Sequence, residues 1–163
     1  MKSILNNSRF SIPKPTPQSA ALSLKLIVFG IGKLTVAFPI ERVHKIINCT
    51  PVHGSGLSHI GITHIDDREV TVVDLHQRLF GFTQPTDIQA KGYLVNVQSA
   101  QGELFSIPTA NAPTLMEAPL SRIRALPESY RRSDTLEIAS HVIMLAQSEK
   151  NLTIFLLDVN RLL

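Results

Sequence analysis

Hydrophobic and polar positions alternate along this chain in short runs that are bounded by turn residues. Apolar runs at residues 24–30 and 33–38 flank Gly32, which tolerates a positive φ, and this pattern predicts a β-hairpin. A second hairpin is predicted over residues 61–65 and 68–73, with Asp66 and Asp67 at its tip. Such short runs, spaced at roughly ten residues, favour small β-barrels over a parallel α/β sheet.

Helical spacing is seen between positions 40 and 47, where four apolar residues would form one stripe. Because Pro39 can open a helix, we expect a short helix over residues 39–47, and residues 111–116 take its place later in the chain. Residues 117–134 read as loop with one helical turn near residues 128–132.

An internal repeat divides the chain into two similar halves. Residues 26–39 around Gly32 resemble residues 93–108 around Gly102, and the segment 68–79 resembles residues 152–163 at the other end. Strands at 138–147 and 152–157 form the last predicted hairpin, and in each half an aspartate, Asp74 or Asp158, is placed to cap the short turn that follows. One small β unit is therefore expected twice.

Length and composition limit the domain organisation. A chain of 163 residues can bury one good core or two small ones. Residues 1–21 are rich in Asn, Ser and Pro and are expected to form a flexible tail, and residues 22–163 a single domain. We place barrel 1 at about residues 22–85 and barrel 2 at about residues 86–163, with a crossover of the chain ends left open.

The apolar runs are too short for a membrane-spanning helix, so neither membrane insertion nor a signal peptide is expected, and the expected location is cytoplasmic. The lone Cys49 fits a reducing compartment and is read as a spectator thiol. The net charge is +3. Its basic cluster (Arg122, Arg124, Arg131 and Arg132) contains a single aromatic residue and no repeated interleaving for base stacking, so we read it as a solvated face or a protein contact, with phosphate binding as the alternative.

Candidate catalytic and metal-binding patterns are weak. The six histidines show no ligand spacing, and no metal or cofactor is expected. Ser140 and His141 should lie on opposite faces of a strand, which keeps the serine from using its neighbour as a base. The chain is therefore not expected to be an enzyme, although a hydrolase with an unrecognised site stays an alternative.

Three blocks of sequence, in order, resemble the CheW family of adaptors, which couple chemoreceptors to the histidine kinase CheA. The most specific block runs from His59-Ile60-Gly61-Ile62 to Val72-Val73-Asp74-Leu75. The others are Phe38-Pro39-Ile40-Glu41-Arg42-Val43 and the C-terminal Leu156-Leu157-Asp158-Val159-Asn160-Arg161-Leu162-Leu163. Together they span about residues 24–163.

The resemblance implies a mainly β fold of two SH3-like five-stranded β-barrels, packed side by side with one or two short helices. It also implies a noncatalytic scaffold in chemotaxis, phototaxis or pilus-driven motility. Its partners would be the regulatory domain of a CheA-like histidine kinase and the hairpin tip of a methyl-accepting-type chemoreceptor, and we expect a monomer when it is alone. A nucleic-acid-binding small barrel and a receptor-binding scaffold without kinase affinity are the other candidates.

The chain departs from the family at two charged positions. Asn-Leu-Arg-Gly is usual where this chain has His64-Ile65-Asp66-Asp67, and glutamate is usual at Lys45. Both signs are reversed together, so Lys45 and Asp66 are expected either to form the family's ion pair with swapped polarity or to be two unrelated surface charges. The residues expected to contact partners are Ile40, Val43, Lys45, Ile46, Gly61, His64, Asp66 and Asp67.

Overall fold

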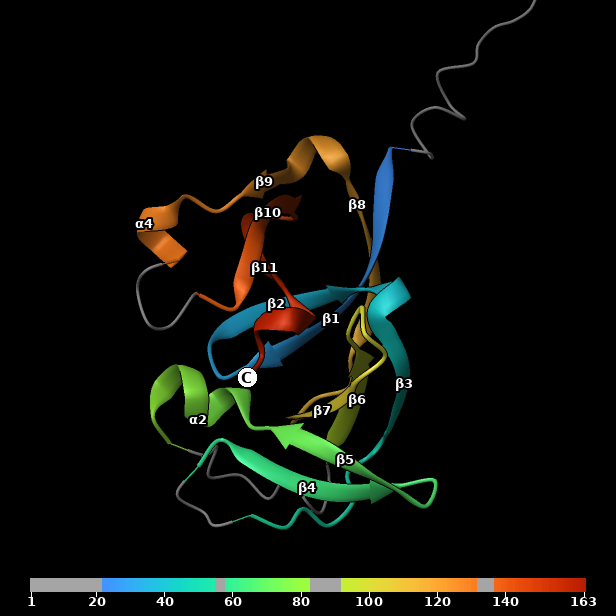
Figure 1. The fold of residues 1–163 in the computed structure, drawn as a ribbon. Helices are drawn as coiled ribbons and strands as arrows, with labels where there is room; N and C mark the ends of the chain where they lie inside the picture. The colour runs from blue at the N-terminus through green and yellow to red at the C-terminus, as the bar shows by residue number, and fades with distance from the viewer. Residues whose placement is uncertain (1–21, 55–57, 83–91, 132–136) are drawn as a thin grey trace, which may run out of the picture.

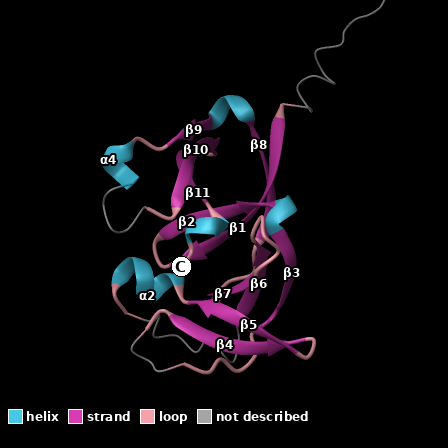
Figure 2. Ribbon diagram, in the orientation of Figure 1, coloured by secondary structure: helices cyan, strands magenta, loops and turns pink. Residues whose placement is uncertain are grey.

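A computed structural model describes residues 22–54, 58–82, 92–131 and 137–163. The described chain is mainly β, with two sheets packed against each other and short helical turns at their ends (Figures 1 and 2). Residues 1–21, where the sequence predicts a tail, lie outside the described residues.

The first sheet has six strands in the order β8-β1-β2-β11-β10-β9. Neighbouring strands are antiparallel except β2 and β11, which are parallel. The strands are β1 (Ser23–Ile31), β2 (Leu34–Pro39), β8 (Thr114–Pro119), β9 (Ile123–Ala125), β10 (Ala139–Gln147) and β11 (Lys150–Leu157). This six-stranded sheet thus contains the first and the last strand of the described chain (Figure 1).

The second sheet has five strands in the order β3-β6-β7-β5-β4, with β5 and β7 as its parallel pair. All of it comes from the middle of the chain. The strands are β3 (Val43–Asn48), β4 (Ile60–Ile65), β5 (Arg68–Val73), β6 (Tyr93–Gln98) and β7 (Leu104–Thr109).

The two sheets share one arrangement, which explains the repeat in the sequence. Strands β8, β1, β2, β11 and β10 follow one another as β3, β6, β7, β5 and β4 do, and β9 is an addition at the edge. Each half of the chain gives its first hairpin to one sheet and its last hairpin to the other. The strands are therefore not divided between the sheets near residues 85 and 86, as the simpler expectation had it; the chain ends cross over.

The predicted helix over residues 39–47 is wrong. Only the 3-10 turn η1 (Ile40–Arg42) follows Pro39, and the rest is strand β3. Residues 111–116 likewise hold no helix, because β8 begins at Thr114 and pairs with β1. β-branched residues are favoured in strands, and pairing with a neighbouring strand outweighs the weak helical periodicity of so short a segment.

The predicted hairpins and caps are confirmed. Gly32 and Gly102 both have a positive φ in the turns that follow β1 and β6. The Asp74 side chain accepts a hydrogen bond from the backbone N–H of Gln77 at the start of α2 (Leu75–Phe80), and Asp158 caps η3 (Val159–Arg161) in the same manner. A turn of helix also occurs where it was expected, as α4 (Glu128–Arg131), whereas the preceding connection contains β9 and η2 (Leu120–Arg122).

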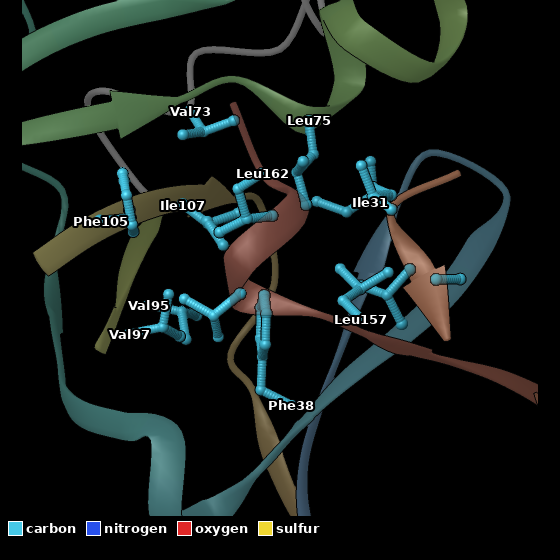
Figure 3. Close-up of a cluster of buried hydrophobic side chains, with 14 of the residues drawn as sticks. Ile31, Phe38, Val73, Leu75, Val95, Val97, Phe105, Ile107, Leu157 and Leu162 are labelled. Carbon is cyan, nitrogen blue, oxygen red and sulfur yellow. The ribbon is translucent and has the colours of Figure 1, made fainter. Parts of the chain in front are cut away.

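An apolar core fills the space between the two sheets (Figure 3). Both sheets contribute, with Phe38 and Leu157 from the six-stranded sheet facing Val95 and Ile107 from the five-stranded one. Phe38 and Ile107 are fully buried. This shared core holds the sheets in a fixed relation, because apolar area removed from water stabilises by about 25 cal/mol per Å².

A polar clamp joins the two sheets beside this core. The Arg78 guanidinium of α2, which follows β5, donates hydrogen bonds to the carbonyl oxygens of Arg161 and Leu162 at 2.9 and 2.5 Å. It also pairs with the Glu137 carboxylate at 2.8 Å. The C-terminal turn is thereby tied to the helix of the other sheet.

Candidate protein-interaction site

The tip of the β4–β5 hairpin presents two aspartates to solvent. Asp66 and Asp67 both have a positive φ, of 51° and 62°. Two successive residues in this region form the turn that suits the twist of a two-residue hairpin, and Asp tolerates it better than most side chains. The side chain of Asp66 is 71% exposed.

Lys45 and Asp66 form an ion pair that links the two edges of the five-stranded sheet. Lys45 lies on the edge strand β3, and Asp66 follows β4 at the opposite edge. The hydrogen bond and the charge of Lys45 lower the pKa of the Asp66 carboxyl, and the charges of His44 and Arg68 lower it further. The paired alternative for these two charges is therefore the one that the structure shows.

The apolar residues predicted on this side do not share one environment. Ile40 in η1 and Ile46 on β3 are exposed. Val43, by contrast, packs against the core between the sheets. Ile40 and Ile46 are consequently available to a partner, whereas Val43 supports the edge strand from inside.

Gly61 and His64 lie on β4 and differ in accessibility. A Cβ atom at Gly61 would come within 2.9 Å of Val52 Cγ1 and 3.1 Å of the His53 carbonyl oxygen. Gly61 thus permits the close approach of the segment at Val52 and His53, and His53 pairs with Ile62 of the same strand. The His64 side chain is exposed, and its ring lies 4.0 Å from the Glu69 carboxylate across the hairpin.

A small pocket lies behind the ion pair, and most of its polar residues were missed from the sequence. It has a volume of about 40 Å³. Its lining comes from every strand of the five-stranded sheet: His44, Lys45, Ile65, Asp66, Arg68, Val70, Asn96 and Leu104. One signal could have revealed it, because the repeat aligns Asn96 with Val28 of the first half.

Asn96 is the least expected member of this lining. The residue is 2% exposed, and neither Oδ1 nor Nδ2 has a hydrogen-bond partner among the described residues. The Ser106 hydroxyl, on the residue paired with Asn96 across β6 and β7, is also buried without a partner there. Buried Thr63 of the same sheet, in contrast, donates to the Pro51 carbonyl oxygen at 2.7 Å.

The expected separation of Ser140 and His141 is wrong. Their Oγ and Nδ1 atoms lie 2.8 Å apart, because the register between β10 and β11 shifts between Ala139 and His141. A bulge of this kind places neighbouring side chains closer to one face. The Ser140 hydroxyl also lies 3.4 Å from the carbonyl oxygen of Leu156.

Comparisons with known proteins identify the fold and the family. The family model of the CheW-like domain matches residues 25–163. The chain belongs to the CheW-like domain family. The crystal structure of the scaffolding protein TtCheW from Thermoanaerobacter tengcongensis matches with a TM-score of 0.67 at 13% identity, covering 83% of this chain and 84% of that one. No curated protein matches the sequence significantly.

The CheW-like fold comprises two SH3-like β-barrels, and the two sheets described above supply them. We refer to them as the six-stranded barrel and the five-stranded barrel. The prediction of a mainly β, two-barrel fold is confirmed, except that β9 gives one barrel a sixth strand.

Proposed function

We propose that this CheW-like chain is a noncatalytic adaptor that couples a chemoreceptor-type sensor to a CheA-like histidine kinase. It would act in chemotaxis, phototaxis or pilus-driven motility, in the cytoplasm. The observation that carries the proposal is the family match over residues 25–163, together with the two-barrel fold.

The surface chemistry supports a protein-binding role. Edge strands present backbone groups and side chains that a partner strand or loop can contact. In the five-stranded barrel these edges are β3 and β4, which carry the exposed side chains of Ile46 and Ile62, although the backbone of Ile62 is already paired with His53. Within the described ranges, no three His, Cys, Asp or Glu side chains are grouped so that they could hold a metal ion.

Nothing in the described helices is both long and apolar enough to cross a bilayer. Arg122 and Arg124, which the nucleic-acid alternative would use, are exposed on η2 and β9 of the six-stranded barrel. No aromatic residue interleaves with them in the sequence, so stacking of bases does not support that alternative.

The partner surface that we propose centres on the Lys45–Asp66 ion pair. Its neighbours would be Ile40 and Ile46 on one edge and Gly61, His64 and Asp67 on the other, while Val43 supports the edge strand from within. A reversed ion pair changes which charges a partner meets, and like charges at an interface disfavour binding. The pair would therefore select a partner whose charges are reversed in the same way.

Calorimetric titration of the regulatory domain of a CheA-like kinase from the same genome tests this function. We expect micromolar binding that Asp66→Arg weakens and Arg122→Gln, on the other barrel, leaves unchanged. Gly61→Arg should weaken it as well, because the close approach to Val52 leaves no room for a side chain. Absence of binding by the folded wild-type chain would contradict kinase coupling.

A charge-reversal cycle tests the role of the pair itself. Lys45→Glu and Asp66→Lys should each weaken kinase binding, because each places two like charges together, and the double variant should recover part of the loss. If the double variant binds as weakly as the worse single variant, the pair does not set partner choice. A receptor-binding scaffold without kinase affinity would bind the receptor hairpin tip only.

A further inference from the structure

The buried residues at the pocket of the five-stranded barrel can be compared with the residues at the equivalent positions of the six-stranded barrel. The cross-strand pair Asn96 and Ser106 on β6 and β7 takes the place of Val28 and Ala37 on β1 and β2. The third strand confirms the equivalence, since Ser106 pairs with Val72 and Ala37 with Leu156, both in parallel register.

At these equivalent positions one barrel is apolar and the other is polar. Val28 and Ala37 are buried in an apolar cluster inside the six-stranded barrel. Asn96 and Ser106 are equally buried, yet their three side-chain polar atoms have no partner among the described residues. Burying such a group without a hydrogen bond costs about 1–3 kcal/mol. The fold does not require polar residues here, which favours a ligand that uses them.

The chemistry of the lining favours an acceptor with one negative charge. Lys45 and Arg68 are cationic and Asp66 is anionic, so the pocket carries one excess positive charge when His44 is neutral. Asp66 is already paired with Lys45, whereas Arg68 forms no ion pair with any described residue. The Asn96 amide adds a neutral donor to the lining, and the Ser106 hydroxyl lies behind the lining, on the residue paired with Asn96 across β6 and β7.

The volume limits the size of the ligand. About 40 Å³ is available, and one water molecule needs roughly 10–15 Å³ of such space. A group of about three heavy atoms fits, which excludes a large metabolite but admits a single carboxylate group, such as the end of an acidic side chain. The pocket is also continuous with the surface proposed for partner binding, because Lys45 and Asp66 belong to both.

We propose that this pocket receives one carboxylate, from an aspartate or glutamate side chain of the protein that docks on the five-stranded barrel. The Asn96 Nδ2 group donates to the carboxylate at the buried end, and Arg68 neutralises it near the mouth. The Lys45–Asp66 pair forms one wall. The origin of the carboxylate in a partner rests on the proposed adaptor function, whereas the pocket's preference for a carboxylate does not.

Acetate is the probe for the pocket itself. The isotope-labelled full chain is titrated with sodium acetate at constant ionic strength, balanced by sodium chloride, while the Asn96 side-chain amide is followed by NMR. We expect saturable shifts of this amide and of the backbone amides of His44 and Arg68. Linear shifts, or equal shifts with chloride alone, would overturn the proposal and leave ordered water as the occupant.

Variants that introduce residues from the equivalent positions of the six-stranded barrel test which atoms bind acetate. Asn96→Val combined with Ser106→Ala copies residues that the same arrangement of strands already accommodates, so this variant should fold. We expect its acetate affinity to fall about tenfold or more, as for loss of hydrogen bonds to a charged group. Arg68→Gln should also weaken binding, and Arg122→Gln is the matched control. Unchanged affinity in the first two variants would overturn the assignment.

Addition of the kinase regulatory domain separates the two possible sources of the carboxylate. If a partner's acidic side chain enters, the Asn96 amide shifts as it does with acetate, and acetate competes with the domain. A domain that binds without affecting Asn96 would overturn the partner as the source and leave a site for a free carboxylate. A domain that does not bind at all would contradict the proposed function, while the acetate titration would still decide the pocket.

Discussion

The two barrels have the same order of strands, but their interiors differ. Among the described residues, seven that are buried and apolar form the cluster inside the six-stranded barrel, including Leu26, Ile143 and Ile154. Three form the cluster inside the five-stranded barrel, and Asn96 lies on the same strand and face as one of them, Leu94. The interior of the six-stranded barrel is thus apolar, whereas the interior of the five-stranded barrel has a polar end that borders a pocket. We infer from this difference that the six-stranded barrel contributes more to stability, whereas the five-stranded barrel carries the proposed binding site.

Placing a polar residue inside the six-stranded barrel gives the largest expected effect. Val28→Asn removes a buried apolar side chain and leaves an amide without a partner, so we expect a loss of about 3–5 kcal/mol in the free energy of unfolding. Urea denaturation measures this loss, with Val28→Ala as the control for volume. A loss below about 1 kcal/mol would mean that the two interiors tolerate polarity equally.

The opposite exchange should stabilise the protein. Asn96→Val combined with Ser106→Ala removes three buried polar atoms that have no hydrogen-bond partner within the described part of the chain, and the free energy of unfolding is expected to rise by about 1–3 kcal/mol. Urea denaturation of this variant beside the wild type measures the gain. A loss of stability instead would show that these atoms are hydrogen-bonded in solution and that the contrast between the barrels is smaller than we infer.

The hairpins of both barrels and their turns could be predicted from local sequence, whereas strands β3, β8 and β9 could not. Residues that need a positive φ mark the turns at Gly32, Gly102 and the Asp66–Asp67 tip, and their chemistry acts over a few residues only. The apolar stripe after Pro39 led to the wrong prediction of a helix. Ile40 and Ile46 fit a helical period by coincidence, whereas the pairing of β3 with β6 determines the structure. The crossing of the chain ends depends on pairing between distant strands, which no local pattern reveals.

The candidate site was only partly predictable. The reversed charges at Lys45 and Asp66 could be seen in the sequence because both departed from the family pattern together. The lack of hydrogen-bond partners for Asn96 among the described residues could not be predicted from the sequence. Whether a buried amide finds a partner depends on side chains from four other strands. Comparison of the two halves of the repeat would have marked the position, without showing that it borders a pocket.

The reactivity of Cys49 tests how open its end of the five-stranded barrel is, compared with the end that carries the pocket. It packs against the apolar cluster inside the barrel, and burial raises the pKa of its thiol. We therefore expect iodoacetamide to alkylate Cys49 several-fold more slowly in the native chain than in urea, because the thiolate is the nucleophile. Timed alkylation followed by mass spectrometry provides the rates. Equal rates would mean that this end is as open as the end with the pocket.

The smallest expected effect concerns the ion pair at the mouth of the pocket. Lys45→Met should raise the pKa of Asp66 toward its ordinary value, because hydrogen bonding and charge from Lys45 are the main causes of the lowered pKa. A lowered pKa contributes stability above the ordinary pKa of the carboxyl, and that contribution is lost as the pH falls through the folded value. NMR titration of the Asp66 carboxyl in both proteins measures the change. An unchanged pKa would show that the pair does not persist in solution.

Reconstitution of signalling tests the central claim most directly. Receptor-containing membranes and the CheA-like kinase are combined with and without this chain, and autophosphorylation of the kinase is measured as the receptor's stimulus is varied. We predict that autophosphorylation follows the stimulus only when the chain is present, and that Asp66→Arg weakens this dependence while Arg122→Gln does not. Kinase activity that is the same with and without the folded chain would contradict its role as an adaptor.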